Sequence, residues 1–189
     1  MHVAWQSGGV GGGSGTSTGA RLEILWARVD AFFARVQERH GAQMDCSAGC
    51  ADCCHVELLV TGVEAQAVRR AAAGLEVVLR DRLRRRARGR TRGRCAALED
   101  DGRCAVYAGR PLACRIHGLP VRTTGRRGLP VVDACERNFR VRGPQSVEPS
   151  AVLDQAEVTT ALAEAEAEDA AAAGRLAGEL WALRDVLAE

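Results

Sequence analysis

The chain has 189 residues, of which 47% are apolar and only 4% aromatic. This length suits one domain with its own core, and the abundance of alanine, valine and leucine favours helices. No apolar run reaches the roughly 18–20 residues of a membrane-spanning helix, and the first residues lack the basic and apolar segments of a secretory signal. We therefore expect a cytoplasmic protein that has no membrane partner.

Charge is unevenly distributed along the chain, although the formal net charge is only +2. Residues 1–150 contain 24 Arg and 15 acidic residues, whereas residues 151–189 contain 2 Arg and 9 acidic residues. Nine arginines fall between Arg80 and Arg94, a density that is typical of nucleic-acid-binding segments. Because this run has no aromatic side chain for base stacking, we interpret it as a solvated helix face and do not expect a nucleic-acid partner.

The first predicted elements are a tail and three helices. Residues 1–19 are Gly/Ser-rich and predict a flexible tail. Apolar residues then recur every three or four positions from Ala20 to a stop at Gly41, which predicts a helix with a buried stripe. Thr61 can cap a second helix that ends at Gly74, and a third helix is predicted from Leu75 to about Ala87, with its apolar residues on one side.

Short hairpins are predicted between these helices and the C-terminal region. Residues 95–107 flank a turn with glycine at position 102 and predict one hairpin. A second hairpin would pair residues 119–121 with residues 129–132 around a basic loop. Residues 135–139 have the pattern of the start of a short helix.

Two signals organise the C-terminal region. Ser150 is a candidate helix cap, and Gly174 is expected to divide the helical segment that follows. The second half would place four leucines on one helix face. They are Leu176, Leu180, Leu183 and Leu187.

Together these elements predict an α-rich α+β fold. We expect a small helical domain with one or two short β-hairpins organised around a cysteine cluster, plus a C-terminal helical arm. The predicted divisions are the tail at 1–19, a cysteine-cluster metal-binding domain at 20–143 and an acidic helical segment at 150–189. That acidic segment would either lie against the basic body or serve a protein partner or a homodimer.

Eight cysteines are the most informative feature of the composition. A disulfide scaffold needs an oxidising compartment, and adjacent cysteines such as Cys53 and Cys54 rarely bond to each other. Soft thiolates select zinc or iron–sulfur clusters over hard cations, and both commonly take four cysteines per site. We therefore predict that all eight are metal ligands: Cys46, Cys50, Cys53, Cys54, Cys95, Cys104, Cys114 and Cys135.

The spacing of the first four cysteines suggests how the ligands are shared. If residues 46–54 were helical, their four sulfurs would lie within roughly 100° of arc. Neighbouring thiols cannot easily reach the same small ion, so Cys53 and Cys54 are expected to serve different metals or different irons of one cluster. Two sites and one larger centre both remain open. In either case the metal would contribute to the free energy of folding.

Several polar residues near the cysteines have two interpretations. Arg110 and Arg115 flank Cys114 and can donate charge-assisted hydrogen bonds toward sulfur or acidic neighbours, or they are ordinary surface residues. We interpret His55 and His117 as neighbours of the site rather than ligands. Glu64 is either structural or accepts a hydrogen bond from the site.

At this point the residues resemble a known family. The order Cys46-x3-Cys50-x2-Cys53-Cys54, followed by Cys95, Cys104, an Arg110-Pro111-x2-Cys114-Arg115 element and Cys135, resembles the YkgJ-type cysteine-cluster proteins with their CxxxCxxCC pattern. The resemblance covers about residues 44–136. It implies a cytoplasmic bacterial protein that chelates zinc or iron, and a similar pattern occurs in a flagellin lysine methylase. It implies no defined activity.

The sequence thus predicts a metal-binding protein whose cysteines chelate an iron–sulfur cluster or zinc, with a structural, electron-transfer or metal-handling role. One alternative is a cluster-dependent oxidoreductase or methyl-transfer enzyme. A second is an Arg-rich nucleic-acid-binding protein with structural zinc. No phosphate-binding glycine loop, Ser-His-Asp triad or carboxylate pair can be assembled, so catalysis stays an open question.

Overall fold

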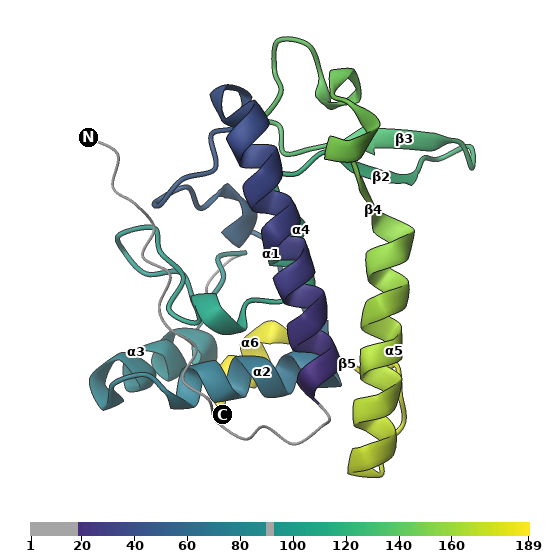
Figure 1. The fold of residues 1–189 in the computed structure, drawn as a ribbon. Helices are drawn as coiled ribbons and strands as arrows, with labels where there is room; N and C mark the ends of the chain where they lie inside the picture. The colour runs from purple at the N-terminus through teal and green to yellow at the C-terminus, as the bar shows by residue number, and fades with distance from the viewer. Residues whose placement is uncertain (1–18, 90–92) are drawn as a thin grey trace.

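The computed structural model describes residues 19–89 and 93–189. The predicted tail, apart from Gly19, and the arginines at positions 90 and 92 lie outside the described residues. The fold is a helix-rich α+β arrangement with small sheets, as predicted (Figure 1). None of the described helices combines the length and apolar character needed to cross a bilayer.

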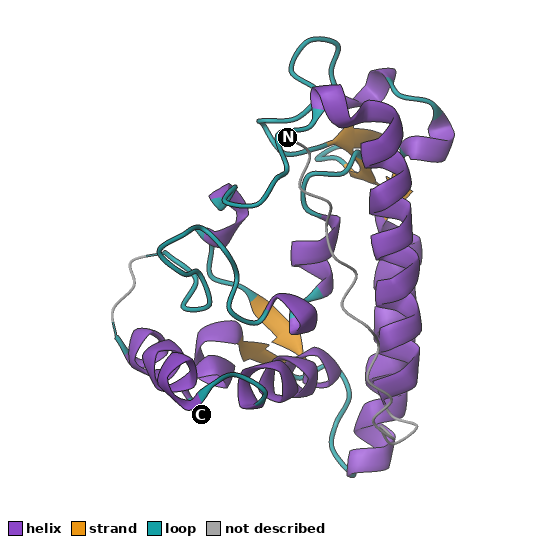
Figure 2. Ribbon diagram, turned by 60° about the vertical axis from the view of Figure 1, so that its left-hand side comes forward, coloured by secondary structure: helices purple, strands orange, loops and turns teal. Residues whose placement is uncertain are grey.

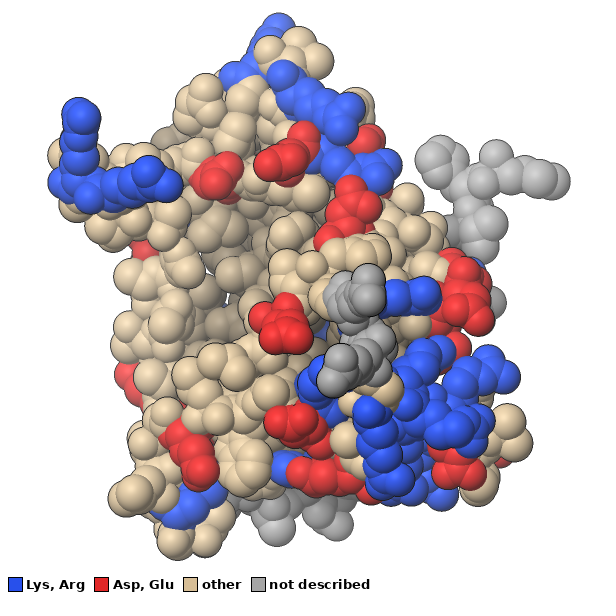
Figure 3. Space-filling view, turned by 180° about the vertical axis from the view of Figure 1, so that it is seen from behind, with Lys and Arg blue, Asp and Glu red and all other residues tan. Residues whose placement is uncertain are grey.

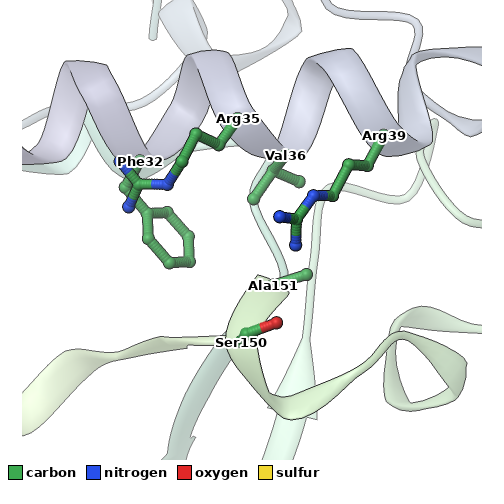
Figure 4. Close-up of a pocket in the computed structure, with 6 residues that line it drawn as sticks. All are labelled: Phe32, Arg35, Val36, Arg39, Ser150 and Ala151. Atoms are coloured by element: carbon green, nitrogen blue, oxygen red, sulfur yellow. The ribbon is translucent and has the colours of Figure 1, made fainter.

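The longest helix, α1 (Ala20–His40), stands beside α5 (Gln155–Ala173) in Figure 1. The predicted stripe of α1 is confirmed, because one face of the helix is buried along its length. The buried residues are Leu22, Leu25, Trp26, Val29 and Val36. Figure 4 shows Val36 of α1 facing Ala151, and both are 2% exposed. These contacts make α1 the scaffold on which the C-terminal half of the chain packs.

Two further helices, α2 (Gly62–Ala73) and α3 (Val77–Arg88), follow the strand β1 (Leu59–Thr61). The predicted cap of α2 is confirmed: Thr61 and Glu64 form a capping box, which satisfies free N–H groups at the helix start. On α3, Leu83 is fully buried, whereas Val78 is 67% exposed. The predicted apolar face of α3 is therefore only partly buried.

Two small sheets accompany the helices. β1 pairs antiparallel with β5 (Leu180–Ala182). β2 (Val121–Thr124) pairs antiparallel with β3 (Pro130–Asp133) and parallel with β4 (Leu153–Asp154). The predicted second hairpin is thus confirmed, although β2 extends into the segment expected to be a basic loop.

The C-terminal region differs from the prediction in two places. Ser150 lies in a 3₁₀ turn, and α5 is instead capped by Asp154, whose carboxylate accepts a hydrogen bond from Ala156 N at 2.9 Å. Gly174 ends α5 with φ +65° as expected. Residues 180–182 then form β5 rather than helix, before the short helix α6 (Leu183–Ala188). Helical periodicity misses this strand because its pairing partner, β1, is distant in sequence.

The remaining short elements are α4 (Leu112–Ile116) and five 3₁₀ helices. The 3₁₀ helices are η2 (Gly41–Gln43), η3 (Asp52–Cys54), η4 (Tyr107–Gly109), η5 (Pro144–Ser146) and η6 (Pro149–Ala151).

The core has two main parts. One lies among α2, α3 and α6, and the loop residues Ala96, Ala97 and Val106 belong to it. The other lies among α1, α5 and the three-stranded sheet, and it includes Leu119 and Phe139. Cysteine-bearing loops are therefore anchored on both parts of the core.

A buried ion-pair cluster attaches the segment after α5 to α2. The guanidinium of Arg175 pairs with Glu166 and Asp169, whose side chains are each 3% exposed. Glu166 also accepts a hydrogen bond from Val63 N at 2.9 Å, and Asp169 from Gln66 Nε2 at 3.0 Å. Burial opposes ionisation of Glu166, but the hydrogen bonds from Arg175 and Val63 outweigh it and lower its pKa.

We predict that Arg175→Gln lowers the free energy of unfolding by about 3–5 kcal/mol, because it leaves buried carboxylates without their cation. The measurement is urea unfolding of the variant and the wild type. The pKa of Glu166 is lower in the folded than in the unfolded state. Its ionised form therefore stabilises the fold above the unfolded-state pKa of about 4.3, and this stabilisation is lost as the pH falls through the folded-state pKa. The difference between the two proteins should therefore shrink between about pH 6 and about pH 3. Equal stability at neutral pH would contradict this account.

Candidate metal centre

Two cysteine-bearing loops lie side by side between the helices, residues 44–58 and residues 93–107 (Figures 1 and 2). At one end, Cys95 N donates to Cys54 O at 2.7 Å. At the other end, a Cβ on Gly102 would lie only 2.7 Å from Gly49 O. This close approach requires glycine at position 102, where φ is +79°.

The second of these loops is the predicted first hairpin. Leu98 and Cys104 form a single antiparallel bridge, and Glu99 N donates to Arg103 O at 2.8 Å. Arg86 of α3 holds the hairpin by donating to Ala96 O at 2.9 Å and by pairing with Glu99. The predicted turn of this hairpin is confirmed. The paired segments are too short to count as β-strands.

The first loop is not the helix supposed for residues 46–54. Residues 48 and 49 form a turn in which Gly49 has φ +93°, and only Asp52–Cys54 is a 3₁₀ helix. A left-handed residue in the middle of the segment breaks the regular 3.6-residue repeat. The loop therefore presents its thiols from two separate turns rather than from one helix face.

Five thiols form what we call the first thiol group: Cys53, Cys54, Cys95, Cys104 and Cys114. Burial raises the pKa of Cys104 to about 11 and of Cys114 to about 12, and negative charge on neighbouring thiols of the group raises both further. These mutual effects mean that thiols from three segments of the chain lie near one another. In the metal-free protein, burial and mutual repulsion keep most of them protonated.

The adjacent pair in this group is electrostatically unequal. The thiol of Cys54 shares a hydrogen bond with Cys53, which lowers the pKa of Cys53 and raises that of Cys54. Positive charge on His117 and Arg110 lowers the pKa of Cys53 further. Cys53 is therefore the thiol that ionises most readily within this pair. That the pair serves two different metals stays a prediction.

The other three cysteines form a second thiol group: Cys46, Cys50 and Cys135. Burial raises the pKa of Cys46, a hydrogen bond from Asn138 partly offsets this rise, and the charges of Cys50, Cys135 and Cys53 of the first thiol group raise it further. Cys135 lies in a turn closed by a hydrogen bond from Asn138 N to Cys135 O at 2.8 Å. The helix start predicted here is wrong, because Phe139 adopts φ +54° and directs the chain back toward Gln43, whose carbonyl accepts from Phe139 N at 2.7 Å.

The donor set fits the metals expected from the sequence. All eight thiols are free and partly buried, and partly buried sulfur donors are what zinc and iron–sulfur clusters select. Within residues 19–89 and 93–189, however, no three His, Cys, Asp or Glu side chains are gathered tightly enough to define an ion site. That these thiols share one or two metal sites therefore stays a prediction.

The arginines beside Cys114 have different roles. Arg115 is 5% exposed and turns toward α1, where it pairs with Asp30 and lies 4.0 Å above the ring of Trp26. It also donates to Ala108 O at 2.7 Å, so it is a structural residue rather than a surface one. Arg110 stacks on Tyr107, and its charge partly offsets the rise in the pKa of Cys104 and Cys114.

Glu64 positions Cys114 from the opposite side. Besides its capping contacts with Thr61, its Oε1 accepts a hydrogen bond from Leu112 N at 2.8 Å. Leu112 begins α4, the helix that carries Cys114. The structural interpretation of Glu64 is therefore correct. His55, in contrast, makes a local contact between Nδ1 and Ala51 O at 3.0 Å.

The residue that sequence reasoning missed is Asn138. Its side chain is within hydrogen-bonding distance of the sulfur of Cys46. The only sequence signal was its position three residues after Cys135.

A comparison with known protein families finds a match to the segment that carries most of the cysteines. Residues 45–128 match the family model CxxCxxCC, described as "Putative zinc- or iron-chelating domain". This confirms the cysteine-cluster resemblance at the level of the domain, and seven of the eight cysteines fall within it, with Cys135 beyond its end. The comparisons with curated proteins and with solved structures found no match.

We predict that Cys53 is alkylated faster than Cys104 and Cys114 in the metal-free protein near neutral pH, because the thiolate is the nucleophile. Cys54→Ala removes the hydrogen-bond donor and should slow alkylation of Cys53. Cys54→Ser keeps a donor and is the matched control, in which the rate should persist. Mass spectrometry of the modified peptides measures both rates. Equal slowing in the two variants would contradict the hydrogen-bond explanation.

Proposed function

We propose that this protein binds a metal centre, an iron–sulfur cluster or zinc, through its eight cysteines, with a structural, electron-transfer or metal-handling role. The ligands would be Cys46, Cys50, Cys53, Cys54, Cys95, Cys104, Cys114 and Cys135. The observation that carries the proposal is that the two loops holding six of the eight partly buried thiols lie side by side, joined by the hydrogen bond from Cys95 N to Cys54 O. A bound metal would supply the positive charge that lets these thiols ionise together.

The surroundings of the thiols support this proposal. Burial disfavours thiolates in the metal-free protein, so metal binding must displace protons, and affinity is expected to rise with pH. Arg110 adds positive charge beside the first thiol group. Zinc or an oxidised iron–sulfur cluster held by four thiolates carries net negative charge, which such a neighbour compensates.

The proposed centre would also join the two parts of the core. Cys95 and Cys104 belong to a hairpin packed on the core of α2, α3 and α6. Cys46 and Cys135 lie beside Met44 and Phe139, which belong to the core of α1 and α5. Metal binding would therefore contribute to stability as well as to any chemistry.

Contacts of the basic run favour metal binding over the nucleic-acid alternative. Figure 3 shows positive charge gathered over α3. Five arginines of this run, however, contact carbonyl or carboxylate groups of the fold itself. They are Arg80, Arg82, Arg86, Arg88 and Arg94. Much of this charge serves internal contacts, so we propose no nucleic-acid function.

The C-terminal leucines likewise have partners within the chain. Leu183 and Leu187 are buried in the core of α2 and α3, so these two side chains do not offer a dimer surface. Leu176 and Leu180 remain exposed. We further propose a cytoplasmic location, because that compartment keeps thiols reduced.

We predict that protein purified without air contains stoichiometric iron and sulfide with visible absorption, or stoichiometric zinc without colour. Elemental analysis and absorption spectra distinguish the two. A variant in which the first thiol group is changed to serine should lose the metal. Gln37→Ala, which alters an exposed contact to Cys46 O, is the control and should retain it. A folded wild-type protein that takes up neither metal under reducing conditions would overturn the proposal.

A further inference from the structure

We propose that Asn138 is a positioning residue of the metal centre, which holds the sulfur of Cys46 through an N–H···S hydrogen bond. This inference rests on the proposed function, since it assigns a role within the same site. It concerns a residue beyond the matched domain, which ends at residue 128.

The side-chain amide of Asn138 is buried, and its nitrogen and its oxygen both form hydrogen bonds within the protein. The residue is 4% exposed. Its Nδ2 donates to Gly118 O at 2.7 Å and to Cys46 Sγ at 3.2 Å. Its Oδ1 accepts from Asp45 N at 2.8 Å. Both amide protons and the carbonyl oxygen are therefore engaged.

These partners fix which end of the amide faces the sulfur. Exchanging Oδ1 and Nδ2 would set an amide nitrogen against the N–H of Asp45 and an oxygen against the carbonyl of Gly118. Both contacts would be repulsive, and both groups are main-chain groups with fixed polarity. The network therefore assigns the N–H side to Cys46.

Gly118 shows that the segments carrying Cys46, Gly118 and Asn138 pack closely together. Gly118 has φ +96°, and a Cβ there would lie 2.5 Å from Cys46 Sγ and 3.1 Å from Asn138 Nδ2. Only glycine fits such a position without displacing the sulfur. Asn138 thus joins the loop of Cys46, the end of α4 and the turn that carries Cys135.

A hydrogen bond of this kind has a chemical consequence for a ligand. An N–H donated to a thiolate withdraws charge from the sulfur without replacing it as a ligand, and such partners orient and tune metal sites. Loss of the Asn138 amide should leave the number of sulfur ligands unchanged. It should change the electronic character of the site and hasten metal release.

The first test uses cobalt as a spectroscopic probe and zinc release to a chelator. Asn138→Ala removes the donor, and Asn138→Asp places a carboxylate oxygen against the sulfur. We expect both variants to shift the sulfur-to-cobalt charge-transfer absorption and to release zinc about tenfold to a hundredfold faster. Val36→Ala, which weakens the same part of the core, is the control and should leave the absorption unchanged.

The outcomes separate this inference from the proposed function. Wild-type protein that binds neither cobalt nor zinc overturns both. Wild-type protein that binds metal while the Asn138 variants match it overturns the positioning role alone. Equal spectral shifts in Asn138→Ala and Val36→Ala would also overturn it, because they would indicate a general loss of packing.

A second measurement needs no variant. Asn138 is the only asparagine of the chain, so selective ¹⁵N-asparagine labelling gives one side-chain amide signal pair. With cadmium or zinc added, we expect one of its two protons to shift and both to exchange slowly with water. A pair that exchanges freely and does not respond to metal would contradict the N–H···S contact.

Discussion

Crowding of partly buried thiols is the constraint on which this structure depends. A single buried thiol can stay protonated at little cost, but thiols that share one site raise one another's pKa and cannot ionise together without a cation. The sequence has eight cysteines, and all of them are partly buried. Main-chain hydrogen bonds and a close glycine contact join the loops that carry them, and these loops also pack on both parts of the apolar core.

The rest of the fold supplies rigid supports for those loops. Arg115 and Asp30 tie the segment before Cys114 to α1, and Glu64 ties the start of α4 to α2. Arg115 also donates to Ala108 O at 2.7 Å, and Glu64 accepts from Leu112 N at 2.8 Å. Hydrogen bonds between segments and packing on the two parts of the core together hold these loops in place.

Local signals made much of this predictable from the sequence. The stripe of α1, the helix cap at Thr61 and the turn at Gly102 each depend on residues close together in the chain, and all three occur as expected. Cysteine spacing identified the domain for the same reason. What failed depended on distant partners: β5 exists because β1 pairs with it, and Asp154 displaced Ser150 as the cap because β4 first pairs with β2. Asn138 was missed because an asparagine has no distinctive spacing, and its role follows only from where Cys46 and Gly118 lie.

X-ray absorption spectroscopy at the zinc or iron edge tests the central claim most directly, because it identifies the atoms bound to the metal. The account predicts a sulfur-dominated shell, with metal–sulfur distances of about 2.3 Å and about four sulfurs per metal. A metal bound mainly by nitrogen and oxygen would contradict it, since the cysteines would then not be the ligands that hold these loops together.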